Sequence, residues 1–538
     1  MTILALISNR LASAGPIDVA FASLAVWLLL KTVTSARRHI TTTKLRGPAG
    51  KSWMYGVGRV IEESQDSGSL FEQWEKEYGH VYTIPHALGS SHVILCDPKA
   101  ATHMWARDTM IYDHPPVTKI ALKNAIGEGV LSAAGESHKR QRKALSPAFS
   151  HSALRKVTPV FVQAAYKVVD AWTSQIETAD NGAMIEVQGW MNHISLDSIG
   201  LAGFSHDFEA LDGKKSTIGD ILDMLDSKPS KTIMLLFMLG FIFPWLINLP
   251  VERNRMLARL NESMEKISLE LLDQTRREKE HIGVETRSVL GLLLKAENID
   301  AELHLSPAEI LAEMKVLMIA GYETTAASMT WALVELAKHP DTQAKLRDEV
   351  TQINGDPTYD QLHNSLPYLD AVVHEILRLH PSVPGLTRQA LEDDVIPLTE
   401  PIEDATGNMV NSLTIAKGTL LTVSINYFNQ SEKYWGADAK QFRPERWLGE
   451  EGVNAVRAKE LQGHRHLQTF SDGPRTCLGR QFALTEFKAV LAVLVRAFAF
   501  ELRDGPSTKV ELTRGLLPRA KVSGEEGLDV PLRVRRID

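Results

Sequence analysis

A short segment of the chain surrounds one cysteine with residues that favour its thiolate form. In the segment FSDGPRTCLG, Cys477 follows Phe470, Gly473 and Arg475 and precedes Gly479. The glycines permit a tight turn and let backbone N–H groups approach the sulfur. Arg475 and the positive end of the helix predicted to follow should lower the thiol pKa. A thiolate held in this way can bind a metal. The alternative, a buried free cysteine in a turn, would not need five matched positions.

A long helix is predicted in the second half of the chain. Ser306, Pro307 and Glu309 form a capping-box-like start, and helical residues continue to about Lys338, before a His-Pro pair. At 1.5 Å per residue such a helix spans about 48 Å. A helix of that length crosses a whole domain, so we expect it to lie in the core.

Reactive side chains lie in the middle of this helix. The segment AGYETT contains Gly321, Glu323 and Thr324. Glycine inside a helix costs about 1 kcal/mol relative to alanine, so its presence needs a reason. An acid followed directly by an alcohol can pass protons to a reacting group. The alternative is a helix kinked by glycine with an exposed polar pair.

The two motifs resemble those of the cytochrome P-450 superfamily, A/G-G-x-D/E-T-T/S and F-x-x-G-x-R-x-C-x-G. They also follow each other along the chain in the order found in that family. The resemblance runs over nearly all the chain and implies a mainly α fold with small β-sheets, a helical prism around a buried haem b. It implies that Cys477 is the axial iron ligand and that its loop contacts the cofactor. The thiolate then favours O–O cleavage. Gly321 would make room for oxygen, and Glu323 and Thr324 would be the catalytic residues that relay protons.

Three arginines match the haem-propionate ligands of this family. The segment HKRQR takes the place of the family's W-x-x-x-R, so Arg142 should bind a propionate through a charge-assisted contact. His138 replaces the tryptophan of that pattern, and its imidazole N–H can make the same bond. Arg388 and Arg475 match the other two propionate-binding arginines.

A second set of matches is predicted to be structural. Glu375 and Arg378 lie three residues apart on an amphipathic helix, which by itself could be a solvated surface pair. Arg446, in the segment PERW, follows at the family's distance. The resemblance therefore implies a buried Glu–Arg–Arg network behind the haem.

The N-terminal segment is predicted to be a membrane anchor. Residues 17–30 are apolar apart from Asp18 and Ser23, and with their flanks they approach the roughly 20 residues that cross a bilayer. Between residues 19 and 61 there are seven bases and no acid, which places the downstream side in the cytosol. A cleaved signal peptide and a buried helix are the alternatives. We expect residues 1–45 to form the anchor with a basic linker, and 46–538 to form the haem-thiolate monooxygenase domain.

Residues 232–250 form a second apolar run, which competes with the first as a membrane span. A crossing there would place Arg142 and Cys477 on opposite sides of the bilayer, although both should contact one haem. Gly240, Pro244 and Asn248 suit a broken helix. We therefore predict that this run lies on the membrane surface, with Trp245 at the interface.

Strands are predicted at few places. Residues 81–84 and 92–95 have the pattern of a hairpin. The region from about 98 to 390 is predicted to be mainly helical, and later strand candidates lie at 418–425 and 509–534.

The composition of the chain, and the motifs that it lacks, limit which partners the protein can have. A net charge of −7 without a basic stripe argues against nucleic-acid binding. No P-loop or dinucleotide motif is present, so electrons should come from a separate NADPH–cytochrome reductase on the endoplasmic reticulum membrane. The positions that should face the substrate are apolar, which indicates a lipophilic substrate, such as a terpenoid, sterol, fatty acid or polyketide, oxidised with O2. A resemblance to fungal microsomal members suggests secondary metabolism and favours a terpenoid-like substrate. A haem-thiolate isomerase or dehydratase and a haem-based sensor are the alternatives.

Overall fold

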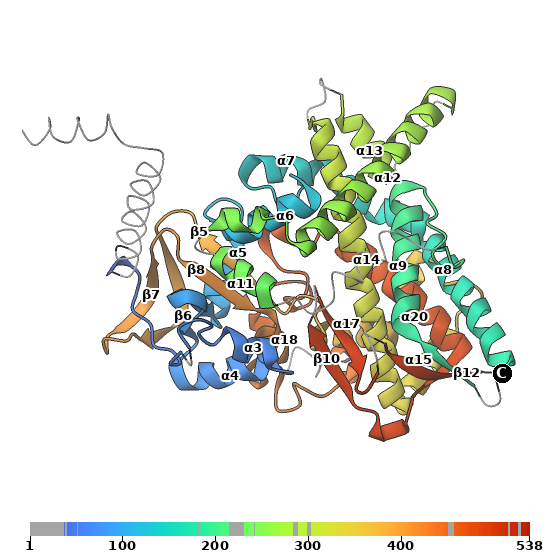
Figure 1. Cartoon of the computed structure of the whole chain (residues 1–538). Helices are drawn as coiled ribbons and strands as arrows, with labels where there is room; N and C mark the ends of the chain where they lie inside the picture. The colour runs from blue at the N-terminus through green and yellow to red at the C-terminus, as the bar shows by residue number, and fades with distance from the viewer. Residues whose placement is uncertain are drawn as a thin grey trace, which may run out of the picture.

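The computed structural model describes residues 37, 40–50, 52–179, 182–214, 231–240, 243–282, 289–298, 303–449, 457–514, 517–525 and 529–537. They form a mainly helical body with small sheets (Figure 1). The helices of the first half are α3 (Gly58–Glu63), α4 (Ser67–Tyr78), α5 (Pro98–Ala106), α6 (Pro116–Ile126), α7 (Gly135–Leu145), α8 (His151–Glu177), α9 (Val187–Phe204), α11 (Lys231–Gly240) and α12 (Glu252–Ile282). Those of the second half are α13 (Val289–Ala296), α14 (Pro307–Lys338), α15 (Pro340–Thr351), α16 (Tyr359–Asn364), α17 (Pro367–Leu379), α18 (Ile425–Gln430), α19 (Glu432–Trp435) and α20 (Arg480–Ala497).

The long helix α14 is the central element. Its N-terminus has the predicted capping box, because the Ser306 side chain accepts from the Glu309 backbone N–H and the Glu309 side chain accepts from the Ser306 backbone. The helix is 32 residues long and most of its side chains are buried. It packs against α9, α12, α17 and α20, and in Figure 1 it runs through the body beside α9. The predicted bounds and the predicted place in the core are confirmed.

Within the described residues, four small sheets flank the helices. The largest has the order β1-β2-β8-β5-β3, in which β2 and β8 run parallel and the other pairs run antiparallel. The predicted hairpin is present as β1 and β2. A second hairpin, β6 with β7, was not predicted. The strands are β1 (Val81–Pro85), β2 (Ser91–Leu95), β3 (Tyr112–Asp113), β4 (Ala183–Glu186), β5 (Gly385–Ala390), β6 (Asp394–Glu403), β7 (Met409–Ile415), β8 (Leu420–Ser424), β9 (Phe498–Leu502), β10 (Val510–Arg514), β11 (Pro518–Val522) and β12 (Pro531–Arg536).

The apolar run at 232–250 is broken, as its sequence predicts. Helix α11 ends at Gly240, and a separate 3-10 turn, η3 (Pro244–Asn248), follows. Trp245 on this turn is 61% exposed. Among the residues that the structure describes, no helix has both the length and the apolar character that crossing a membrane requires. The predicted anchor at 17–30 lies outside the described residues.

Candidate functional site

The cysteine loop is a tight turn held by its own backbone. Gly473 begins the 3-10 turn η7 (Gly473–Arg475), and the Cys477 N–H donates to the Phe470 carbonyl over 2.9 Å. Gly473 has a φ of +68°, and a Cβ there would lie 2.1 Å from the Trp105 carbonyl oxygen. Glycine is therefore required at this position. Gly479 has an ordinary φ of −82°, so its conformation does not require glycine.

The Cys477 sulfur lies between hydrogen-bond donors and cations. The backbone N–H groups of Gly479 and Arg480, at the start of α20, and the guanidinium groups of Arg142 and Arg480 lie near enough to favour its charged form. Burial nevertheless raises the pKa of the thiol above its ordinary value, and these groups offset only part of that effect. The start of α20 thus lowers the thiol pKa as expected, and the cations that add to this effect are Arg142 and Arg480. A bound metal cation would supply the missing positive charge, because coordination deprotonates a thiol outright.

The four predicted propionate ligands come together beside this loop. Burial, and then Arg475 and Arg142, lower the pKa of His138 to about 4, so its imidazole is neutral and can donate one N–H. Arg142, one turn further along α7, is close enough to Cys477 for the two to interact electrostatically. Arg388, on β5, lies near Arg475. Helix α7, strand β5 and the cysteine loop thus direct these side chains to one region.

Two aspartates that were not predicted bind two of these arginines. The Arg388 Nε donates to both carboxylate oxygens of Asp108, over 3.0 and 2.9 Å. Arg475 binds Asp108 over 3.3 Å and Asp113 over 2.8 Å. It also donates to the carbonyls of Leu131 and Ala133. Most N–H groups of Arg475 therefore donate to protein acceptors. Arg388 has more N–H groups that remain available for another acceptor.

The centre of α14 differs in detail from the expectation. A Cβ on Gly321 would lie 3.0 Å from the Ile199 side chain of α9. The close packing of α9 against α14 therefore explains the glycine, and its role in making room for oxygen stays a prediction. The Thr324 hydroxyl donates to the Ala320 carbonyl over 2.7 Å, a local bond that side-chain hydroxyls in helices often form.

Glu323 has a partner that lies far away in the sequence. Its Oε1 accepts from Nη2 of Arg519, on β11, over 2.7 Å, and both side chains are 2% exposed. Glu323 and Thr324 are neighbours in the chain, yet the structure gives them different partners. Strand β11 packs against α14. Sequence reasoning missed Arg519, because no motif marks it.

The structure brings the three members of the predicted structural network into contact. Arg378 donates to both Glu375 oxygens over 2.9 and 2.8 Å, and Arg446 donates to Glu375 over 2.9 Å. The Trp447 indole and the Arg443 backbone N–H also donate to this carboxylate. Burial raises the Glu375 pKa, but Arg378 and Arg446 outweigh it, so the pKa lies below its ordinary value.

Comparison with known proteins decides the family. The cytochrome P-450 family model matches residues 46–523. The chain belongs to the cytochrome P-450 family. It is 51% identical over 531 residues to cytochrome P-450 monooxygenase claQ of Ampulloclitocybe clavipes, covering 97% of this chain and 99% of the relative. It is 32% identical over 548 residues to cytochrome P-450 monooxygenase 205 of Postia placenta, covering 98% of each. It is also 32% identical over 455 residues to a ganoderic acid synthetase of Ganoderma lucidum, covering 80% and 83%.

This P-450 is a monooxygenase, an oxidoreductase whose family uses haem with a cysteine thiolate as iron ligand. The two cysteines can be tested against that requirement. Cys96 is fully buried, and its sulfur lies 4.0 Å from the Tyr82 hydroxyl. The Cys477 sulfur lies near two backbone N–H groups and two arginines, and the residue presents accessible surface. The residues around Cys477 therefore fit a haem iron, and those around Cys96 do not.

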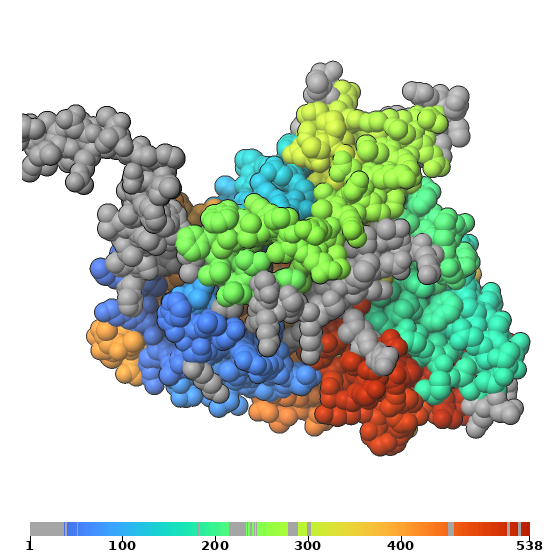
Figure 2. Space-filling view, viewed as in Figure 1, coloured from blue at the N-terminus to red at the C-terminus, as the bar shows by residue number. Residues whose placement is uncertain are grey.

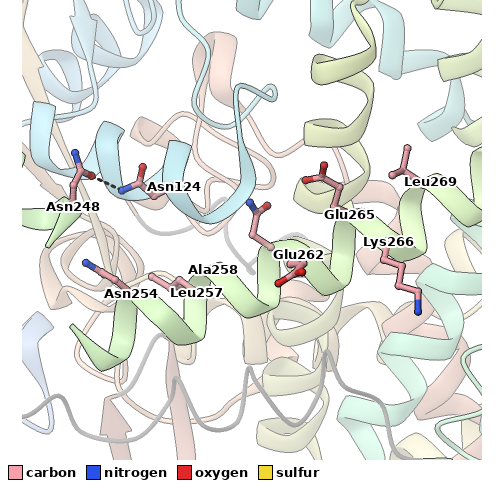
Figure 3. A pocket seen from close by; sticks show the side chains of 10 residues that line it. Asn124, Asn248, Asn254, Leu257, Ala258, Glu262, Glu265, Lys266 and Leu269 are labelled. Carbon is pink, nitrogen blue, oxygen red and sulfur yellow. Dashed lines mark hydrogen bonds between the residues drawn. The ribbon is translucent and has the colours of Figure 1, made fainter. Parts of the chain in front are cut away.

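A surface cleft lies beside α6 of this P-450. It has a volume of about 680 Å³ and lies between α6, η3 and α12. The Asn124 amide donates to Asn248 over 2.8 Å and links α6 to η3 across it, as Figure 3 shows. Its lining combines asparagine, glutamate and lysine side chains with apolar ones, and none of the predicted haem ligands belongs to it. It is therefore distinct from the cysteine site.

Proposed function

We propose that this P-450 holds haem b through Cys477 and inserts one oxygen atom of O2 into a lipophilic substrate. The observation that carries the proposal is the placement of the Cys477 sulfur against two backbone N–H groups and two guanidinium groups. Donors of this kind stabilise a thiolate ligand. The bound haem supplies oxygen activation, which the thiolate promotes.

Replacement of Cys477 tests the proposal directly. In Cys477→Ala the reduced carbonyl complex should lose its red-shifted Soret band, because that band reports a thiolate opposite the carbon monoxide. Cys96→Ala is the matched control and should keep the band. A Cys477→Ala protein with the wild-type band would remove Cys477 from this role and leave Cys96 as the ligand.

The chain's own residues bind the cofactor carboxylates and handle protons. Arg142, Arg388 and a neutral His138 offer N–H groups to propionates, and Arg475 contributes less because it is engaged by two aspartates. The Thr324 hydroxyl holds a proton at the centre of α14. Glu323, the preceding residue, would accept and return protons when its hydrogen bond to Arg519 opens. Glu375, Arg378 and Arg446 have a structural role.

We also propose a substrate class and a redox partner. The names of the relatives include a ganoderic acid synthetase, which supports a terpenoid-like substrate in fungal secondary metabolism. An NADPH–cytochrome reductase would deliver the electrons. Screening of metabolites by difference spectroscopy would find the substrate, and NADPH consumption coupled to an oxygenated product would support the monooxygenase. Conversion without NADPH and O2 would indicate an isomerase or dehydratase instead.

We propose that residues 1–45 anchor the protein in the endoplasmic reticulum membrane and that residues 46–538 form the cytosolic domain. Exposed apolar side chains support contact with the membrane: Leu235 and Trp245 on the broken segment, and Trp53 and Met54 before α3. Figure 2 shows the broken segment, in green, on the surface beside the blue N-terminal part of the body.

Protease protection on sealed microsomes tests this topology. A tag after residue 538 should be digested without detergent, and a protected tag would contradict the topology. Trp245→Ala should weaken binding to vesicles when residues 1–45 are removed. Leu269→Ala, at another exposed apolar side chain, is the control and should leave binding unchanged.

A further inference from the structure

One buried carboxylate joins two of the arginines that face the cofactor. Asp108 lies in the turn between α5 and β3 and is 0% exposed. Its Oδ2 lies 2.9 Å from the Arg388 Nε, and its Oδ1 lies 3.3 Å from the Arg475 Nε. Arg388 belongs to β5 and Arg475 to the cysteine loop, so Asp108 connects two elements that lie far apart in the sequence.

The turn that carries Asp108 is fixed from several sides. Thr109 has a φ of +77°, a conformation that is unusual for a β-branched residue. The Thr109 N–H donates to the Asp108 carboxylate over 2.9 Å, and its carbonyl accepts from Gly135 at the start of α7. Trp105 lies just before the turn, and a side chain at Gly473 would clash with its carbonyl oxygen. Asp108 is thus held against α7 and the cysteine loop together.

A second carboxylate accompanies Asp108. Asp113 is 2% exposed, binds the Arg475 Nη2 over 2.8 Å and also pairs with Lys119. Two carboxylates therefore face three cations, Arg388, Arg475 and Lys119. The cluster keeps one formal positive charge in excess, which suits a neighbouring anion such as a carboxylate.

Without Asp108, the positive charges of Arg388 and Arg475 would repel each other. Arg388 and Arg475 both bind Asp108, and their side chains are only 3% and 6% exposed. A buried charge is tolerated only when it is paired, and like charges in a low dielectric repel strongly. Asp108 therefore removes the main obstacle to placing both guanidinium groups at one site. The Nη2 of Arg388 makes no hydrogen bond within the described residues, so its two N–H groups stay available.

We propose that Asp108 is a positioning residue, which orients Arg388 and Arg475 toward a haem carboxylate and sets the charge beside the cofactor. The inference rests on the proposed function, in which these arginines bind the haem propionates. It assigns to the turn after α5 a part in haem binding that no motif in the sequence marks.

The reduction potential of the holoenzyme tests this inference. Asp108→Asn keeps the size of the side chain and removes its negative charge. The added net positive charge disfavours the ferric state, so the midpoint potential should shift to a more positive value in spectroelectrochemistry. Haem transfer to apomyoglobin should also be several-fold faster, because both guanidinium groups lose their shared partner. Asp108→Glu keeps the charge and should restore most of the wild-type potential.

The controls separate a positioning role from a general effect on the fold. Asp197→Asn changes another buried aspartate, which accepts from the backbone N–H groups of Ala210 and Leu211, and it should leave the potential unchanged. If Asp108→Asn yields no haem protein, Asp113→Asn decides: a positive shift supports the proposal and an unchanged potential overturns it. Wild-type potential and haem transfer in Asp108→Asn overturn it as well. Failure of the proposed function is distinct, since the wild-type protein would then lack the thiolate carbonyl band.

Discussion

Glu323 and Arg519 form a buried ion pair with 2.7 Å between Oε1 and Nη2, although 196 positions separate them in the sequence. The pair joins the acid of the central helix to the C-terminal hairpin of β10 and β11. The Thr324 hydroxyl, one residue away, bonds to the Ala320 carbonyl instead. The acid and the alcohol of the motif therefore have different hydrogen-bond partners.

A double-mutant cycle should show that the pair is coupled. Glu323→Gln and Arg519→Met should each cost about 3–5 kcal/mol in the free energy of unfolding, because each leaves a buried charge without this partner. The double variant should cost less than the sum by about 1–3 kcal/mol. Urea unfolding followed by fluorescence measures the three values, and strictly additive costs would contradict the coupling. Arg519→Lys should recover part of the loss, since it keeps the charge.

Thr324→Ala should separate oxygen consumption from product formation. The variant keeps the haem ligands, so haem content and substrate-induced spectral changes should match the wild type. Product per NADPH should fall and hydrogen peroxide should rise, because a positioned proton donor contributes about 10²–10⁴-fold to a rate. Thr324→Ser retains the hydroxyl and should retain the coupling. An unchanged yield in Thr324→Ala would exclude this hydroxyl from proton delivery.

Glu375→Gln should destabilise the protein far more than a change at Glu445, a glutamate that is only partly buried. The Glu375 carboxylate is 0% exposed and neutralises Arg378 and Arg446, so its removal should cost about 3–5 kcal/mol. Glu445→Gln is the control. Glu445 lies one residue before Arg446 and pairs with Lys345 at the surface, where such pairs contribute about 0–1 kcal/mol. Equal melting temperatures for the two variants would contradict the buried network.

The sequence predicted the parts of the site that lie within single elements or in spaced motifs. The capping box at Ser306, the break at Gly240 and the hairpin of β1 and β2 depend on local rules that act over a few residues. Asp108 and Arg519 could not be found in this way, because each acts through a partner brought close only by the fold. A buried aspartate in a turn and an arginine in a strand have no periodicity that distinguishes them from surface residues.

The missed hairpin has a local cause. The β6 segment DVIPLTEPIE contains prolines at 397 and 401, and proline within a run argues against a strand. The structure accommodates them with a change of register between Pro397 and Ile402.

Glu486 should make stability depend on pH. It lies on α20, is 0% exposed, and the Ser195 and Ser198 side chains of α9 lie near its carboxyl. Burial raises its pKa from 4.5 to about 8, and the two serines oppose this only in part. Between pH 4.5 and about 8 the folded protein therefore keeps a proton on Glu486 that the unfolded chain has already released. Because the unfolded state binds fewer protons there, the contribution of Glu486 is complete below pH 4.5 and is lost as the pH rises through about 8. Glu486→Gln should flatten the decline of unfolding free energy over this range, measured by urea denaturation at several pH values. A variant whose curve keeps the wild-type slope would show that Glu486 is already ionised in the folded protein.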